Sequence, residues 1–114
     1  YDKVILGGFS QGAMLTSHLS VKNSHMVDGL ICYSGNLVGQ TELVKALETS
    51  KKFPFFQSHG KRDPILGYEY AKQLFELLKL GGHQGEFVGF DGVHEIPVEI
   101  LKKSDTYLKK VLSS

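Results

Sequence analysis

The stretch VILGGFSQGAML, residues 4–15, decides the fold of this chain. It opens with a short apolar run of β-forming residues, Val4–Leu6, which Gly7-Gly8 ends. From Gln11 onward, residues recur at helical spacing: Ala13, Met14, Leu15, His18 and Leu19. The stretch therefore predicts a strand, a tight turn and a helix in direct succession.

The rest of the chain continues the same alternation of strands and helices. Further strands are predicted at Leu30–Tyr33, Phe53–Gly60 and Glu86–Phe90, and further helices at Thr41–Lys52, at Tyr68–Leu80 and from Pro97 onward. The last helix is expected to bury a stripe made of Ile100, Leu101, Tyr107, Leu108, Val111 and Leu112. Such alternation is typical of an α/β fold, here about four parallel strands with helices packed on both faces.

A G-x-S-x-G motif, Gly8-Phe9-Ser10-Gln11-Gly12, lies at the first predicted turn between strand and helix. In that context the turn must be sharp enough to project the Ser10 hydroxyl above the sheet. Glycines at positions 8 and 12 would remove side chains that collide there. The motif in this place predicts a nucleophilic serine rather than an incidental one.

The same glycines also suggest a phosphate-binding loop, because Gly7 and Gly12 have G-x-x-x-x-G spacing. A P-loop needs Lys and then Ser or Thr next, whereas Ala13 and Met14 stand there. A dinucleotide-binding G-x-G-x-x-G is absent from the sequence as well. Nucleotide binding is therefore disfavoured.

A serine hydroxyl needs a neighbouring base, and the base needs an acid that orients it. Asp63 follows the third predicted strand, and His94 follows the fourth. Taken alone, Asp63 is typical of a turn before proline and His94 of a helix-flanking surface histidine. Taken with Ser10, they occur in the order Ser, Asp, His, each after a parallel strand, which predicts a catalytic triad.

The other histidines have structural explanations. His59 precedes Asp63 by four positions and is expected to support its loop rather than face the serine. His18 falls on the first helix, where a packed or solvated side chain is expected, and His25 and His83 fall in connecting segments where exposure is expected. None of them fits the order of the proposed triad.

Two further alternatives concern the last loop. Asp91 could compete as the triad acid, but it shares a loop with His94, whereas the hydrolase order places the acid one strand earlier. Asp91, His94 and Glu95 also suggest a metal site, but a second set of ligands is lacking. Both alternatives are disfavoured.

With these motifs in place, the chain resembles the phospholipase/carboxylesterase family of the α/β-hydrolase superfamily. The matching segments are residues 7–13, His59-Gly60 leading to Asp63-Pro64, and residues 94–97, so the resemblance covers nearly all of the chain. The family includes acyl-protein thioesterases, lysophospholipases and small bacterial carboxylesterases.

The resemblance implies a role for each of four residues. Ser10 would be the nucleophile, Asp63 the triad acid, His94 the general base, and the backbone amide of Gln11 an oxyanion donor. It also implies a small-molecule or lipid ester or thioester substrate, with no cofactor and no metal.

Two departures from the family pattern are visible. Val93 stands where the family usually has a glycine, and Ile65-Leu66-Gly67 stands where Val-Pro follows the aspartate.

Family members also have strands and helices before the strand that leads to the nucleophilic serine, including a loop that donates a second oxyanion amide. The chain is therefore expected to be the carboxyl-terminal half of a larger domain, with an uncovered edge strand prone to self-association. Loss of one oxyanion donor typically costs about 100- to 1000-fold in turnover, so this half alone would be a weak enzyme.

The composition excludes several classes of protein. Of the 114 residues, 41% are hydrophobic and 22% are charged, as in ordinary globular chains, and the formal net charge of +1 disfavours nucleic acid as a partner. The lone Cys32 excludes an intrachain disulfide framework and is compatible with a reducing cytoplasm. No apolar run approaches the ~20 residues of a transmembrane helix. The first residue is not methionine, so a targeting segment could precede it.

Two other classes of function remain open at this point. One is a non-catalytic α/β-hydrolase-like module, or an inactive fragment, that binds a ligand or a protein. The other is a flavodoxin-like binding domain, which predicts a phosphate-bearing cofactor at the first turn.

Overall fold

The computed structural model describes residues 3–35 and 40–113. Strands and helices alternate along this part of the chain, as predicted. The strands are β1 (Ile5–Phe9), β2 (Gly29–Tyr33), β3 (Pro54–Gly60) and β4 (Gln84–Phe90). The helices are α1 (Gln11–Lys22), the short 3-10 helix η1 (Ser24–Met26), α2 (Gln40–Thr49), α3 (Tyr68–Leu80) and α4 (Val98–Ser113).

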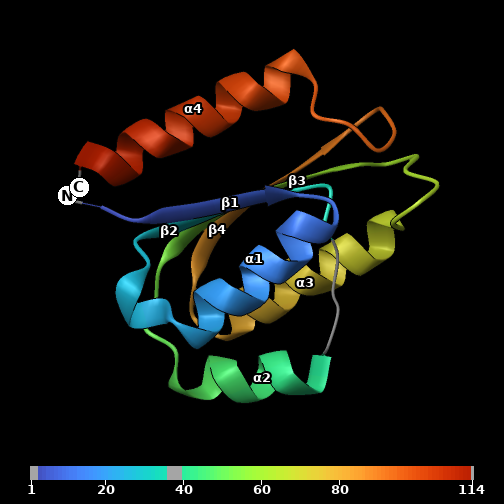
Figure 1. Ribbon diagram of the computed structural model, residues 1–114. Coiled ribbons are helices and arrows are strands. Elements are labelled where there is room, and N and C mark those ends of the chain that lie inside the picture. Colours follow the sequence, from blue (N-terminus) through green and yellow to red (C-terminus); the bar gives the residue numbers. More distant parts are fainter. Residues whose placement is uncertain (1–2, 36–39, 114) are drawn as a thin grey trace.

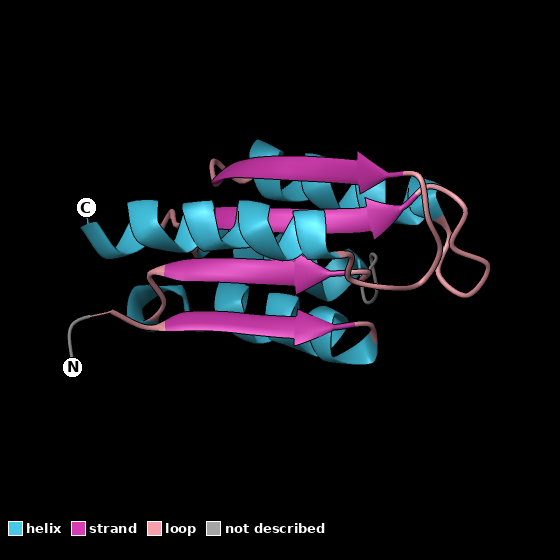
Figure 2. Cartoon of the chain, turned by 90° about the horizontal axis from the view of Figure 1, so that it is seen from above, coloured by secondary structure: helices cyan, strands magenta, loops and turns pink. Residues whose placement is uncertain are grey.

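All four strands form one parallel sheet in the order β1-β2-β3-β4. The arrows in Figure 2 therefore run side by side in one direction. Because neighbouring strands are parallel, each connection must cross from one end of the sheet to the other, and the intervening helices do this. The carboxyl ends of the strands consequently share one edge, where loops can bring distant residues together.

Helices cover both faces of the sheet unequally, with α1, α2 and α3 on one face and α4 alone on the other (Figure 1). The face covered by α1, α2 and α3 buries a cluster that includes Leu30, Phe55 and Leu74. The face under α4 buries a second cluster built around Ile31, Phe56 and Tyr107. The alternation Leu30/Ile31 and Phe55/Phe56 follows from the two-residue period of a strand, which sends successive side chains to opposite faces. The predicted α/β class with helices on both faces is confirmed.

The first strand is longer than predicted. Gly7 and Gly8 do not end it but pair with Ile31 and Cys32 of β2, and the strand continues to Phe9. A glycine can take extended backbone angles as readily as turn angles, so the pair of glycines was a poor marker of the strand end. The strand therefore ends at Phe9 rather than at Leu6, and the turn falls on Ser10 itself.

The buried stripe of α4 is narrower than predicted. Leu101 and Leu112 are 49% and 59% exposed, whereas Ile100, Ser104, Tyr107 and Val111 are buried. In the described part of the chain α4 has only the sheet to pack against, so it buries one row of residues three to four positions apart. Within this row the Tyr107 hydroxyl accepts a hydrogen bond from the Leu30 amide and donates one to the Pro54 carbonyl.

The predicted exposure of His83 was wrong, because its ring is buried between α2 and the start of β3. The Phe53 amide donates to Nδ1 at 3.1 Å, which places the ring hydrogen on Nε2, 3.1 Å from the Ser50 hydroxyl. Burial, with a smaller effect of the nearby Lys52 charge, lowers the pKa of His83. A connecting segment can thus bury a histidine when the ring satisfies backbone and hydroxyl groups around it.

Candidate active site

Ser10 occupies a strained turn between β1 and α1. Its φ of 60° and ψ of −122° lie in a region that residues with a side chain rarely adopt. The Ser10 amide donates to the Tyr33 carbonyl at 2.9 Å, and the Ser10 carbonyl accepts from the amides of Ala13 and Met14. The serine is thus bonded to β2 on one side and to the first turn of α1 on the other, which holds the strained angles in place.

The two motif glycines contribute differently to this turn. A Cβ added at Gly8 would lie 2.5 Å from the backbone of Gly12, so only glycine fits at position 8. A Cβ added at Gly12 would meet nothing within 4 Å in the described structure. The expectation that both glycines prevent a collision is therefore right for Gly8 and wrong for Gly12.

The structure brings Ser10, Asp63 and His94 together at the carboxyl edge of the sheet. His94 Nε2 lies 2.8 Å from Ser10 Oγ, and His94 Nδ1 lies 2.7 Å from Asp63 Oδ2. Because a carboxylate only accepts hydrogen bonds, Nδ1 carries the hydrogen and the neutral ring presents a free lone pair at Nε2 to the Ser10 hydroxyl. The arrangement can remove a proton from Ser10 while Asp63 stabilises the resulting imidazolium.

Asp63 is held as a carboxylate by its surroundings. Its side chain is fully buried, and Oδ1 accepts hydrogen bonds from the amides of Ile65 at 2.8 Å and Leu66 at 2.9 Å. Burial by itself would raise the pKa of Asp63, but hydrogen bonds from the Leu66 amide, His94 and the Ile65 amide outweigh burial and lower the pKa. A charged acid beside His94 Nδ1 is what the proposed base needs.

The loops that carry Asp63 and His94 are joined by their backbones. The Lys61 amide donates to the Phe90 carbonyl and the Arg62 amide to the Gly92 carbonyl, both at 2.9 Å. Asp91, considered above as a competing acid, instead accepts from Arg62 Nε at 2.9 Å on the exposed surface. Asp91 therefore links the two loops and forms no hydrogen bond with His94 in the described part of the chain.

Of the histidines considered above, His59 lies next to Asp63, whereas His18 and His25 lie outside the group of Ser10, Asp63 and His94. His59 is fully buried, and its Nε2 lies 2.6 Å from the Leu66 carbonyl, which confirms that it supports the Asp63 loop. His18 lies in α1, and His25, which is exposed as predicted, lies in η1.

Phe9 is a site residue that sequence reasoning missed. Its ring packs against the His94 ring, with 4.9 Å between centroids and 42° between planes. This contact restricts the orientation of the imidazole, and an aromatic ring beside it is favourable when the imidazole becomes a cation. Only its place between Gly8 and Ser10 could have suggested the contact, because nothing in a single sequence places position 9 beside position 94.

Gln11 lies where an oxyanion donor is expected. It is the first residue of α1, so its amide has no carbonyl one turn earlier in the helix. The positive end of the helix dipole adds to the attraction for negative charge beside Ser10.

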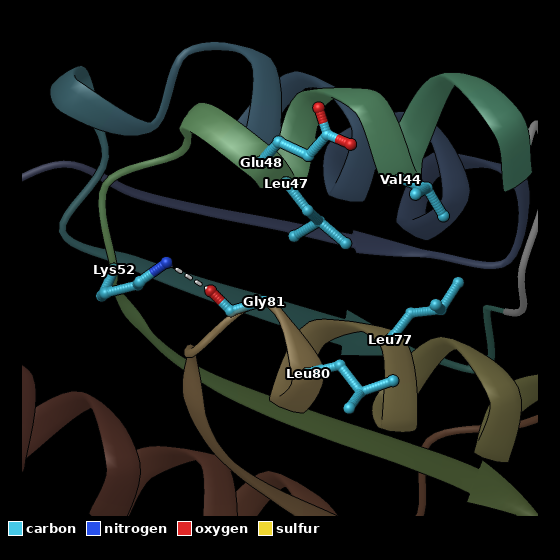
Figure 3. Close-up of a pocket in the computed structure, with 7 residues that line it drawn as sticks. All are labelled: Val44, Leu47, Glu48, Lys52, Leu77, Leu80 and Gly81. Atoms are coloured by element: carbon cyan, nitrogen blue, oxygen red, sulfur yellow. Dashed lines mark hydrogen bonds between the residues drawn. The ribbon is translucent and has the colours of Figure 1, made fainter.

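A groove on the described surface lies away from these residues. Figure 3 shows it between α2 and α3, lined by Val44, Leu47, Glu48, Lys52, Leu77, Leu80 and Gly81. Lys52 and Gly81 precede β3 and β4, so this groove lies at the amino ends of the strands, opposite the serine. Among the described residues no group of three or more His, Cys, Asp or Glu side chains could hold a metal ion, and no helix is long and apolar enough to cross a membrane.

A parallel α/β sheet with a serine at a sharp turn between strand and helix defines the α/β-hydrolase class of fold. The crystal structure of esterase PE8 has this fold too, with a TM-score of 0.85 at 24% identity over 94% of this chain and 49% of that chain. The sequence pattern of the phospholipase/carboxylesterase family matches residues 1–112, and the chain belongs to that family.

Named relatives agree with this assignment. Acyl-protein thioesterase 1 of Debaryomyces hansenii is 33% identical over 97% of this chain and 49% of its own length. Acyl-protein thioesterase 1 homolog 1 of Dictyostelium discoideum is 34% identical over 87% of this chain and 45% of its own length. The chain thus spans about half the length of these relatives.

Proposed function

We propose that the protein is a serine hydrolase that cleaves carboxylic ester or thioester bonds through an acyl-enzyme intermediate. The observation that carries this proposal is the continuous chain of hydrogen bonds from Ser10 Oγ through His94 to Asp63, at 2.8 Å and 2.7 Å. The family membership supports the same class of reaction.

The first half of the reaction forms the acyl-enzyme. Ser10 Oγ attacks the acyl carbon while its proton moves to His94 Nε2, and Asp63 stabilises the imidazolium. The negative charge that develops on the carbonyl oxygen is stabilised by the Gln11 amide at the start of α1. The intermediate then collapses, and the alcohol or thiol leaves with the proton from His94.

The second half releases the acid. Water gives a proton to His94 Nε2 and attacks the acyl carbon, and collapse of the second intermediate returns the proton to Ser10 Oγ. No step requires a metal or a redox group, in keeping with the cofactor-free expectation of the family resemblance. The names of the relatives favour thioesters of acylated proteins as substrates, and lipid or small-molecule esters share the same reacting carbonyl.

We also propose that the chain is the carboxyl-terminal part of a complete hydrolase domain. The coverage of about half of each relative supports a partial domain, and the family resemblance would assign the second oxyanion donor and much of the acyl pocket to the remaining half. In the described structure β1 pairs with β2 alone, so its other edge is open to a further strand or to a second copy of the chain. Light scattering across a concentration series tests the self-association.

Intact mass after treatment with a fluorophosphonate tests the catalytic assignment. The wild-type chain is expected to gain a single adduct, which Ser10→Ala should abolish. An equal adduct in Ser10→Ala would refute the role of Ser10. No adduct in the wild type, with the fold intact by circular dichroism, would favour the non-catalytic alternative for this chain, and the same pair of measurements on the full-length protein would decide the parent's activity.

A further inference from the structure

A second buried histidine contacts the carboxylate of the candidate triad. His59 lies near the end of β3 and is fully buried. Its Nε2 is 3.3 Å from Asp63 Oδ2, the oxygen that also accepts the 2.7 Å hydrogen bond from His94 Nδ1. The reaction described above uses His94 and Asp63 but gives His59 no part.

The neighbours of His59 determine where its ring hydrogen lies. The Leu66 carbonyl, 2.6 Å from Nε2, only accepts hydrogen bonds, and so does a charged Asp63. Nε2 therefore carries the hydrogen and donates to the carbonyl, with the carboxylate oxygen near the same hydrogen. Nδ1 is buried without a hydrogen-bond partner in the described part of the chain. A buried polar atom without a partner costs free energy, so the contacts of Nε2 with the Leu66 carbonyl and Asp63 must offset the cost of burying Nδ1.

These contacts close a ring between the strand and the acid loop. Asp63 Oδ1 accepts from the Leu66 amide, the Leu66 carbonyl accepts from His59, and His59 Nε2 returns to Asp63 Oδ2. Because His59 belongs to β3, where it pairs with Gly89 of β4, it is a rigid support. Both ends of the loop from residue 60 to residue 66 are thereby tied to the sheet.

We propose that His59 is a positioning residue for the triad, holding the Asp63 carboxylate so that Oδ2 stays within hydrogen-bond reach of His94. The inference rests on the proposed function for its catalytic consequence, but the hydrogen-bond geometry itself can be measured without turnover. A loss of position of about 1 Å can cost about 100-fold in rate, and this sets the expected scale.

The test compares His59→Leu with His59→Gln. Leucine fills similar space but removes the donor, whereas the side-chain amide of glutamine can place an N–H close to the former Nε2. The first readout is the downfield proton NMR resonance of the His94 Nδ1–H, which reports its hydrogen bond to Asp63. The second is the rate of fluorophosphonate labelling per folded molecule. In His59→Leu the resonance should shift upfield or broaden and labelling should slow by up to about 100-fold, and His59→Gln should restore most of both.

His83→Leu is the matched control. It also removes a buried histidine that bonds to backbone, but His83 lies just before β4 and contacts Phe53, next to the opposite end of β3. Its loss should therefore lower stability and leave both readouts unchanged. Ser10→Ala separates this inference from the proposed function, because it removes labelling while the His94–Asp63 resonance persists. A wild-type chain with the resonance but no labelling would keep the positioning role and favour the non-catalytic alternative for this chain.

Three results would overturn the inference. The first is His59→Leu with an unchanged resonance and unchanged labelling, which would reduce His59 to packing. The second is a wild-type protein without the downfield resonance. The third is a hydrogen on Nδ1 of His59 in nitrogen-15 NMR of the wild type, which contradicts the proposed donation. This measurement decides if His59→Leu fails to fold, and a hydrogen on Nε2 would then support the inference.

Discussion

Replacing Gly60 by alanine should misalign the candidate triad without unfolding the sheet. Gly60 ends β3, and the loop that carries His94 passes directly over it. A Cβ at position 60 would lie 2.6 Å from the Gly92 carbonyl oxygen and closer still to that of Val93. Ordinary van der Waals contact begins at 3.4 Å, so the Gly92 carbonyl must retreat by about 0.8 Å, and the Val93 carbonyl, directly before His94, by more.

The size of the effect follows from that displacement. The hydrogen bonds of His94 are 2.8 Å and 2.7 Å long, and a retreat of more than about 0.8 Å at the neighbouring Val93 takes at least one of them beyond effective range. A misplacement of about 1 Å costs about 100-fold in rate, so Gly60→Ala should slow labelling by about 10- to 100-fold. Overpacking at a tight contact costs about 1–3 kcal/mol, which is smaller than the stability of most domains.

The assay is the rate of fluorophosphonate labelling, corrected for the folded fraction from a urea titration. Gly7→Ala is the matched control, because its Cβ would meet only Ile31 atoms at 3.5 Å or more, in ordinary contact, on the same sheet. It should label at nearly the wild-type rate. A Gly60→Ala protein that is folded and labels as fast as Gly7→Ala would refute the argument that the crowded loop contact sets the position of His94.

Two further predictions concern stability. Ser10→Gly should be more stable than Ser10→Ala by about 1–3 kcal/mol in urea unfolding, because only glycine relieves the strain at φ 60°; equal stabilities would show that the turn is unstrained. His83 has a lowered pKa in the folded state, so the unfolded chain binds more protons below about pH 6.5 and the free energy of unfolding should fall as pH drops through that value. His83→Gln should flatten this dependence, and an unchanged slope between about pH 6.5 and 5 would contradict it.

The fold could be predicted because its signals are local. The buried strand β2 is a continuous apolar run, β3 opens with one, and α3 has its apolar residues at helical spacing. Strand ends were less predictable where glycine stands, since Gly7 and Gly8 suit both a strand and a turn. The exposure of Leu101 and Leu112 depends on how many neighbours α4 has, and this is a property of the assembled layers rather than of the helix sequence.

The candidate site could be predicted only in its outline. Ser10, Asp63 and His94 follow the first, third and fourth strands, and topology brings them together because the carboxyl ends of parallel strands share an edge. The contact of Phe9 with His94 and the bond of His59 to the Leu66 carbonyl depend on side-chain directions within a few ångströms. A pattern of residue types along the chain does not carry that information, and the burial of His83 escaped prediction for the same reason.

The strain at the serine and the rigidity of the two loops belong to one physical arrangement. Ser10 is pushed out of favourable backbone angles, and the cost is sustained because Tyr33 and α1 hold its amide and carbonyl. Asp63 and His94 are exposed to no comparable strain, but their loops are bonded to each other through the backbone. The distances within the site are therefore set by strand ends and backbone contacts rather than by flexible side chains. It follows that changes at Gly8 or Gly60, which carry no chemistry, should reduce activity as surely as changes at the residues that do.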